Sequence, residues 1–221
     1  MPRPTGFPLL PASLRPPAIA LTFVCFGMTV ALGGRYAGQS EAGWLDAAIG
    51  SRVQARLAGQ VPLLSLGLLV QLPAVAVITV LLCGWHLLTG RWRPLTLVLI
   101  AVPAAGVATE VVLKPFIGRT HLGGFAFPSG HATAAFAIAV VVAVLLANPP
   151  RPRAPALLRL ALASAALLAA GLVCVALVAT GSHYPTDTVG GATVATAVVL
   201  LTALVIDRLA EWRRASTAQD D

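Results

Sequence analysis

The stretch LALASAALLAAGLVCVALVAT occupies residues 160–180 and contains no charged side chain. A helix needs roughly 20 mainly apolar residues to cross the hydrocarbon core of a bilayer, where backbone polar groups can only be paired within the segment. This stretch therefore predicts a membrane-spanning helix. The composition of the chain agrees, because 57% of its 221 residues are hydrophobic and only 10% are charged.

Other stretches share this length and hydrophobicity, and together they predict an all-α, polytopic membrane protein built as a six-transmembrane-helix bundle. The predicted spans are 17–34, 61–88, 94–113, 131–147, 160–180 and 188–206. They form a single domain over 1–221, with an N-terminal segment 1–16, a six-helix core 17–206 and a tail 207–221. The first loop carries Leu45, Ile49, Val53 and Leu57 at a spacing of four, which predicts an amphipathic helix. That helix lies either on the outer membrane interface or packed on the protein surface.

Basic residues are unevenly distributed between the predicted loops. The N-terminal segment, the second and fourth loops and the tail carry Arg3, Arg15, Arg91, Arg93, Arg151, Arg153, Arg159, Arg208, Arg213 and Arg214. Because cytoplasmic loops are enriched in Lys and Arg, both termini are expected in the cytoplasm and the odd-numbered loops on the extracytoplasmic side of the plasma (inner) membrane. The basic residues lie singly or in pairs, which argues against a nucleic-acid partner despite the net charge of +7.

The third loop combines cations, glycines and the start of an apolar helix. It runs from Lys114 through Arg119 and His121 to Pro128-Ser129-Gly130-His131. Ser129 is suited to cap the following helix, and the exposed N–H groups at a helix start attract anions. The loop is therefore a candidate phosphate cradle. Taken alone, the same features occur more often in an ordinary glycine-rich connector than in a binding site.

The fifth loop places His183 and Asp187 four residues apart, with Pro185 at the expected first turn of the last helix. A carboxylate at this spacing can orient an imidazole and stabilise the cation that forms when the ring attacks an electrophile. His183 is then a candidate nucleophile and Asp187 its partner. As an isolated feature, the pair also fits a simple helix-capping contact.

Glu110 is a carboxylate inside the third predicted span, four residues before Lys114. Carboxylates within a membrane are rarely left unpaired, and glutamate preceding lysine by four is the favourable orientation on a helix. We therefore expect a Glu110–Lys114 ion pair that supports the site. The three cysteines, Cys25, Cys83 and Cys174, all fall in apolar segments, so the sequence predicts no disulfide and no metal site.

These residues resemble the type 2 phosphatidic acid phosphatase superfamily. Its second motif, Pro-Ser-Gly-His, is present at Pro128 to His131, and the His-x-x-x-Asp core of its third motif is present at His183 and Asp187. The resemblance implies that His183 attacks phosphorus, that Asp187 orients it, and that His131 protonates the leaving oxygen and later activates water. It also implies that Lys114, Ser129 and the Gly130 amide bind the substrate phosphate. Two arginines of the family pattern are absent, because His121 and Leu177 stand in their places, and Arg119 with His121 is the expected substitute in binding the phosphate.

The resemblance further implies a metal-independent lipid phosphatase without a cofactor, acting through a phosphohistidine on phosphatidic acid, phosphatidylglycerol phosphate or a polyprenyl diphosphate. Its expected partners are the lipid bilayer and a membrane lipid phosphate substrate. An alternative is a protein of low or no activity that binds lipid phosphates, or a small transporter. Few polar residues inside the spans, mainly Gln71 and Glu110, argue against transport.

Overall fold

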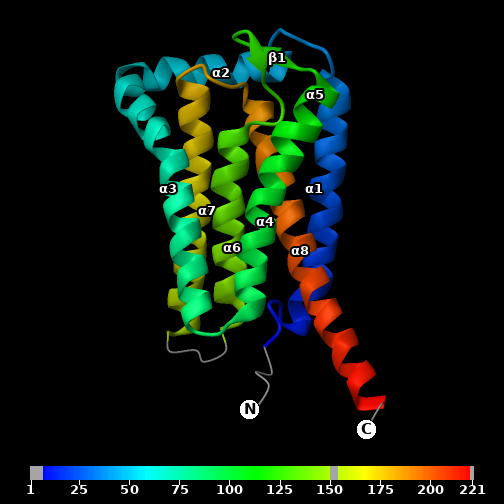
Figure 1. The fold of residues 1–221 in the computed structure, drawn as a ribbon. Helices are drawn as coiled ribbons and strands as arrows, with labels where there is room; N and C mark the ends of the chain where they lie inside the picture. The colour runs from blue at the N-terminus through cyan, green and yellow to red at the C-terminus, as the bar shows by residue number, and fades with distance from the viewer. Residues whose placement is uncertain (1–6, 150–153, 220–221) are drawn as a thin grey trace.

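The computed structural model describes residues 7–149 and 154–219, and within them it contains six helices long and apolar enough to cross a membrane (Figure 1). This confirms the predicted all-α, multi-pass fold. The long helices are α1 (Arg15–Tyr36), α3 (Val61–Leu88), α4 (Trp92–Val107), α6 (Gly130–Ala147), α7 (Ala156–Ala179) and α8 (Pro185–Gln219). Helix α4, the third of these, is prolonged by a π-helical turn, Ala108–Leu113, and by the short helix α5, Lys114–Ile117.

The helix ends agree with the predicted spans within a few residues, with one large exception. Helix α8 begins at Pro185, as expected, but continues to Gln219, so most of the predicted tail 207–221 is helical. Arg208 and Glu211 lie one turn apart there and form an exposed ion pair, which suits a helix that leaves the apolar layer without ending. Of the basic residues used to predict orientation, Arg3, Arg151 and Arg153 lie outside the described residues.

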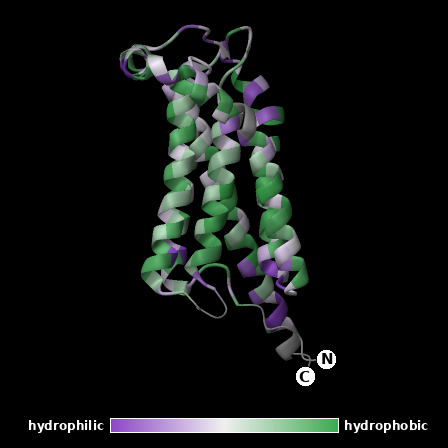
Figure 2. Cartoon of the chain, turned by 90° about the vertical axis from the view of Figure 1, so that its left-hand side faces the viewer, coloured by the Kyte–Doolittle hydropathy of each residue, from purple (hydrophilic) through white to green (hydrophobic). Residues whose placement is uncertain are grey.

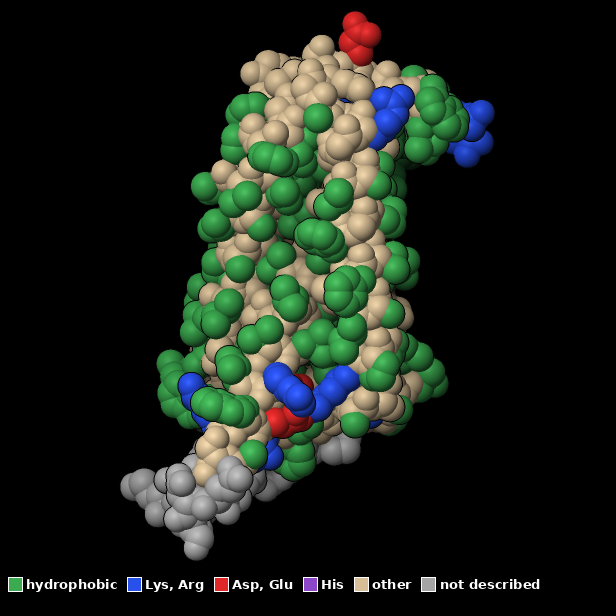
Figure 3. All heavy atoms as spheres, turned by 90° about the vertical axis from the view of Figure 1, so that its right-hand side faces the viewer, with side chains coloured by type: hydrophobic (Ala, Val, Ile, Leu, Met, Phe, Trp, Pro, Cys, Tyr) green, Lys and Arg blue, Asp and Glu red, His purple; other side chains and the backbone are tan. Residues whose placement is uncertain are grey.

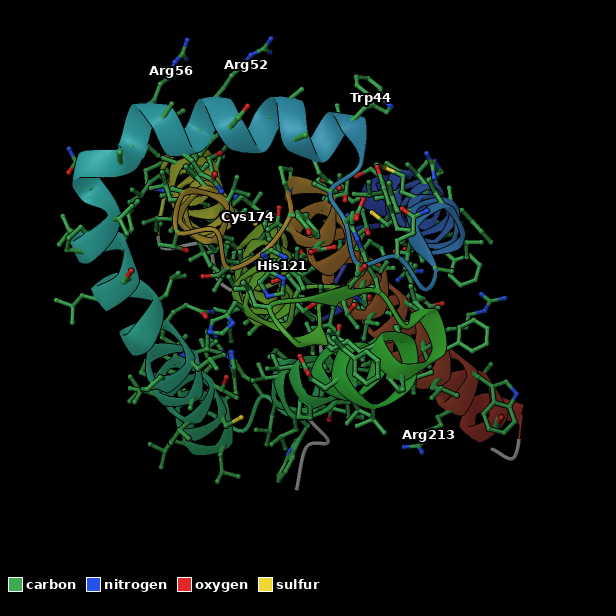
Figure 4. The ribbon with its side chains drawn as sticks, turned by 90° about the horizontal axis from the view of Figure 1, so that it is seen from above. Trp44, Arg52, Arg56, His121, Cys174 and Arg213 are labelled. Carbon is green, nitrogen blue, oxygen red and sulfur yellow. The ribbon has the colours of Figure 1, made fainter. Side chains whose placement is uncertain are left out.

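The first loop contains the predicted helix, α2 (Trp44–Leu57), which is joined to α3 by a 3₁₀ turn at Ala58–Gln60. Figure 4 shows α2 running across one edge of the bundle's end, with Trp44, Arg52 and Arg56 pointing away from the other helices. Gln54 Nε2 donates to the Val178 carbonyl of α7 at 3.1 Å. The buried residues of α2 are Asp46 and Gly50, rather than the predicted apolar stripe, and they face the bundle. Trp44 and Ile49 are exposed.

Small side chains fill the centre of the bundle, where α6 packs against α4, α7 and α8. The most buried of them are Leu97, Val98, Ala101, Ala137, Val141, Ala195, Val199 and Ala203. Small residues let helix backbones approach closely, which is the main source of packing energy when lipid already surrounds the outer faces. Figure 2 shows the hydrophobic colour along the middle of the helices and the hydrophilic residues toward their ends. This distribution suits a bundle surrounded by hydrocarbon.

At the end of the bundle where both termini lie (Figure 1), Asp207 is 2% exposed and its carboxylate has four contacts. Figure 3 shows acidic and basic side chains together near this end. The amides of Leu9 and Leu10 donate to the Asp207 carboxylate at 2.8 and 2.9 Å, and Arg93 does so at 3.2 Å. Arg15 lies 4.0 Å away and bonds Glu211 at 2.6 Å. The carboxylate thereby ties the N-terminal segment to α4 and α8.

The third loop lies at the opposite end and contains a β-hairpin that the sequence did not predict. Strand β1 (Thr120–His121) pairs antiparallel with β2 (Gly124–Phe125). The two residues between them, Leu122 and Gly123, have φ angles of 52° and 81°. A two-residue hairpin turn with both φ angles positive matches the twist of the strands, and glycine supplies the second at little cost. The hairpin projects above the start of α6 (Figure 1).

Candidate active site

The starts of α6 and α8 meet at the end of the bundle that carries the hairpin. The Ser129 amide donates to the Asp187 carbonyl at 3.0 Å, and the Ser129 hydroxyl accepts from the Ala132 amide at 3.4 Å, so Ser129 caps α6 as predicted. The close approach depends on Gly191, where a Cβ would meet the Ser129 carbonyl oxygen at 2.5 Å and the Ala132 methyl at 2.9 Å. The third and fifth loops are therefore joined by direct backbone packing.

His183 and Asp187 form the predicted pair at the start of α8. The Nδ1 atom of His183 lies 3.6 Å from Asp187 Oδ2, slightly beyond hydrogen-bond length, and the His183 side chain is 13% exposed. The same carboxylate oxygen accepts the Tyr184 amide at 3.1 Å, which closes the turn between the two residues. Among the described residues, His183 Nδ1 is buried without a hydrogen-bond partner. The imidazole thus has Asp187 behind it, poised at a distance that a small shift would close.

A groove of about 520 Å³ brings His183 and His131 together, although they come from different loops. Ser65, Leu68, Leu72 and Pro73 of α3 line it with Leu177 and Ser182. Its wall is mostly apolar, and the two imidazoles are its titratable groups among the residues that line it. Leu177 occupies the position where the family pattern carries an arginine. The groove is therefore aliphatic at a point where that pattern would place a cation.

Lys114 and Glu110 form the predicted ion pair, with 2.8 Å between Lys114 Nζ and Glu110 Oε2. They lie on and just after the π-helical turn that follows α4 in the third span, a type of distortion that is frequent at functional sites. The Glu110 carboxylate occupies the space where a Cβ on Gly130 would lie, and Lys114 Nζ is 3.8 Å from the same point. Glycine at the first position of α6 therefore lets a cation and its counterion reach the helix start, where an anion would bind.

Arg119 was expected to bind substrate phosphate, but its side chain has 0% exposure and lies inside the protein. Its Nη1 donates to Asp187 Oδ1 at 2.6 Å and its Nη2 to Asp46 Oδ2 at 2.7 Å. His121, the other expected phosphate ligand of that loop, points toward the centre of the bundle's end in Figure 4. Its Nε2 lies 2.8 Å from the Gly181 carbonyl, and its ring packs on Tyr184 with centroids 4.3 Å apart. Both side chains are thus held by contacts within the protein.

The sequence did not single out Asp46, Tyr36 or Thr186, which surround Arg119. Asp46 is 2% exposed and sits on the face of α2 that packs on the bundle. A carboxylate near the start of an otherwise apolar stripe is the feature that could have drawn attention to it, since charges are seldom buried unpaired. Within residues 7–149 and 154–219, no cluster of three or more His, Cys, Asp or Glu side chains is arranged to hold a metal ion.

These features define a class of protein: a membrane-embedded helical bundle with a His/Asp pair and a second histidine in one groove, next to a cationic helix start. The chain belongs to the PAP2 superfamily, whose family model matches residues 69–211. The match covers the π-helical turn, the third and fifth loops and most of α8. No curated protein and no solved structure matches the chain. Membership supports phosphatase activity on phosphate esters, which in this family are often lipids.

Proposed function

We propose that this protein is a lipid phosphate phosphatase that works through a phosphohistidine. The observation that carries the proposal is the shared groove, because it places the imidazoles of His183 and His131 in one apolar cleft that faces the α3 side of the bundle. A phosphate ester bound there would have one imidazole available for attack and another available for proton transfer. The wall of leucine and proline side chains suits the apolar part of a lipid.

The chemistry follows from the orientation of the His183 ring. Because Nδ1 faces Asp187, Nε2 is the atom that attacks phosphorus, and Asp187 stabilises the positive charge that the ring acquires. The P–O bond to the lipid breaks as the P–N bond forms, and His131 transfers a proton to the departing oxygen. Water then attacks phosphorus, His131 takes a proton from it, and the P–N bond breaks to release inorganic phosphate.

Charge on the phosphoryl oxygens would be balanced by Lys114 and by N–H groups at the start of α6, around Gly130. Fixed cations and backbone donors stabilise such charge without reorganising during the reaction. Ser129 shapes this helix start through its cap, since its hydroxyl is fully buried. We propose turnover without a metal ion or cofactor. The excess of basic residues near the end with the termini favours a cytoplasmic location for that end, which leaves the groove on the extracytoplasmic side.

The direct test measures phosphate release from purified protein in mixed micelles containing phosphatidic acid, phosphatidylglycerol phosphate or a polyprenyl diphosphate, with EDTA present. We expect turnover of at least one of these lipids. His183→Ala should abolish it, by about 10⁴-fold or more, and His131→Ala should reduce it by about 10²- to 10⁴-fold.

A matched control is Arg208→Gln. The Arg208 side chain is 86% exposed and lies far along α8 from the groove. It should retain wild-type turnover. Undiminished phosphate release by His183→Ala would contradict the phosphohistidine mechanism. Binding of these lipids without release by the wild type would favour a non-catalytic lipid-phosphate binder instead.

A further inference from the structure

Arg119 joins two carboxylates that come from distant parts of the chain. Asp187 belongs to the start of α8 and Asp46 to α2, and each accepts one of the two terminal guanidinium nitrogens. The distances of 2.6 and 2.7 Å are those of charge-assisted hydrogen bonds. All three side chains in these ion pairs have 0% exposure. Both terminal nitrogens of the guanidinium therefore donate to protein side chains, and Arg119 is not among the residues that line the groove.

Thr186, the residue before Asp187, binds the Asp46 carboxylate through two hydrogen bonds. Its amide donates to Asp46 Oδ1 at 2.9 Å, and its hydroxyl lies 2.9 Å from Asp46 Oδ2. The same hydroxyl accepts from Arg119 Nη1 at 2.7 Å. Helix α2 is therefore tied to the first turn of α8 both directly, through the Thr186 backbone, and through the guanidinium. A displacement of α2 would move the carboxylate that faces His183.

Two tyrosine rings enclose the guanidinium. The Arg119 Cζ atom lies 4.1 Å from the centroid of Tyr36, at the end of α1, and 4.5 Å from the centroid of Tyr184. Burial raises the pKa of the Tyr184 phenol, with the Arg119 charge opposing that shift, so the ring remains neutral beside the cation. Water is excluded from both faces, and charges separated from water interact more strongly than charges at the surface.

The network carries one more negative than positive charge, because two carboxylates share one guanidinium. A group able to balance the excess is His183, whose Nδ1 lies 3.6 Å from Asp187 Oδ2. An imidazole becomes cationic when its other nitrogen attacks phosphorus. The excess negative charge would then be matched in the transition state and unmatched in the resting protein, which is the difference that accelerates a reaction.

We infer that Asp46 and Arg119 are positioning residues, which hold Asp187 against His183 and set the charge behind the nucleophile. The inference rests on the proposed function, since it assigns these two residues a part in that reaction. Neither residue touches the substrate. The first outer loop, through α2, becomes part of the apparatus that aligns the nucleophile, although it lies outside the segment matched by the family model.

The experiment separates turnover from anion binding. Asp46→Asn and Arg119→Gln are compared with wild type for kcat and KM on the lipid turned over, and for inhibition by orthovanadate, a phosphate analogue. We expect kcat to fall by about 10- to 100-fold, as is usual for residues that orient a catalytic group, while KM and the vanadate inhibition constant stay within about 2-fold. Arg52→Gln is the matched control, because Arg52 is exposed on the same helix and points away from the bundle (Figure 4).

The double variant Asp46→Asn/Arg119→Gln adds a test of charge balance. Arg119→Gln alone leaves two buried carboxylates without a cation, whereas the double variant leaves one. We expect the double variant to retain more kcat and a higher melting temperature than Arg119→Gln. Should a single variant fail to fold, the double variant still decides the question through its kcat, which must lie below that of wild type.

Different outcomes overturn different statements. If Asp46→Asn keeps the wild-type kcat, the positioning role is wrong. If Arg119→Gln weakens vanadate inhibition about tenfold with kcat preserved, the positioning role is also wrong, and Arg119 contacts the anion instead. If wild type and Arg52→Gln both release no phosphate from any of the lipids, the proposed function fails and the inference fails with it. Active wild-type protein with an unaffected Asp46→Asn contradicts the inference alone.

Discussion

Both ends of the bundle bury aspartate beside arginine, yet only one of them has the features of an active site. Asp207, near the termini, accepts two backbone amides and Arg93, with Arg15 close by, so its single charge has more than enough partners. At the other end, Asp46 and Asp187 share Arg119, and an imidazole stands next to the second of them.

A buried ion pair therefore does not by itself indicate function. The Asp207 cluster is complete within the protein and is suited to stability, because every added partner lowers the cost of burying its charge. The Asp46–Arg119–Asp187 network is incomplete by one positive charge and borders a groove. The two clusters differ in that the second leaves one negative charge unbalanced beside His183, the proposed nucleophile.

The most direct test of this difference replaces the aspartate at each end of the bundle in turn and measures both turnover and stability. Asp187→Asn should lower kcat by about 10³- to 10⁴-fold, because the amide neither stabilises an imidazolium nor favours the correct tautomer. Asp207→Asn should instead lower the free energy of unfolding by about 3 kcal/mol, since it removes one partner of a buried ion pair. Phosphate release per folded molecule and thermal melting in detergent measure the two effects. A loss of kcat in Asp207→Asn without a loss of stability would mean that the two ends do not differ as described.

A smaller effect is expected from Glu110, whose negative charge competes with a bound anion for Lys114. Glu110 pairs with Lys114 beside the start of α6, so an anion arriving there must take Lys114 from it. Glu110→Gln should therefore tighten vanadate inhibition by up to about 10-fold, equivalent to about 1.4 kcal/mol. Vanadate titration of the wild type and the variant measures the change. Weaker inhibition in the variant would show instead that Glu110 holds Lys114 in its binding position.

A third effect concerns stability, through the packing at the junction of the third and fifth loops. Gly191→Ala should destabilise the protein by about 1 to 3 kcal/mol, because the added methyl collides with the Ser129 carbonyl and the Ala132 side chain. Gly171→Ala in α7 is the matched comparison, since nothing lies within 4 Å of its added Cβ. It should be neutral or stabilising by up to about 1 kcal/mol. Equal melting temperatures for the two variants would contradict the close approach of α6 and α8.

Much of the fold was predictable because the bilayer imposes a strong constraint on length and hydrophobicity. The six long helices, the helix in the first loop, the start of α8 at Pro185 and the Ser129 cap were all predicted and are confirmed. The extension of α8 to Gln219 was not, because a polar helix outside the apolar layer lacks the pattern that marks a span. The hairpin was missed as well, since a two-residue strand is too short to show alternation.

The candidate site was predicted in part. The Glu110–Lys114 pair and the approach of Asp187 to His183 follow from a spacing of four, which brings side chains together on one helix or across its first turn. The roles assigned to Arg119 and His121 as phosphate ligands did not anticipate their contacts with Asp46, Asp187 and Gly181. Those partners lie on other elements, and no local spacing encodes them.

The amino-acid sequence alone was enough to predict six helices long and apolar enough to span a membrane, and to show the resemblance to phosphatases through the second motif and the core of the third. Those features are local: hydrophobic length, helical spacing and short motifs act over a few turns of one segment. Only the tertiary structure decided that His131 and His183 share a groove and that α2 reaches Asp187 through Asp46 and Arg119. Such contacts arise from the packing of helices distant in the chain, where burial forces each charge to find a partner.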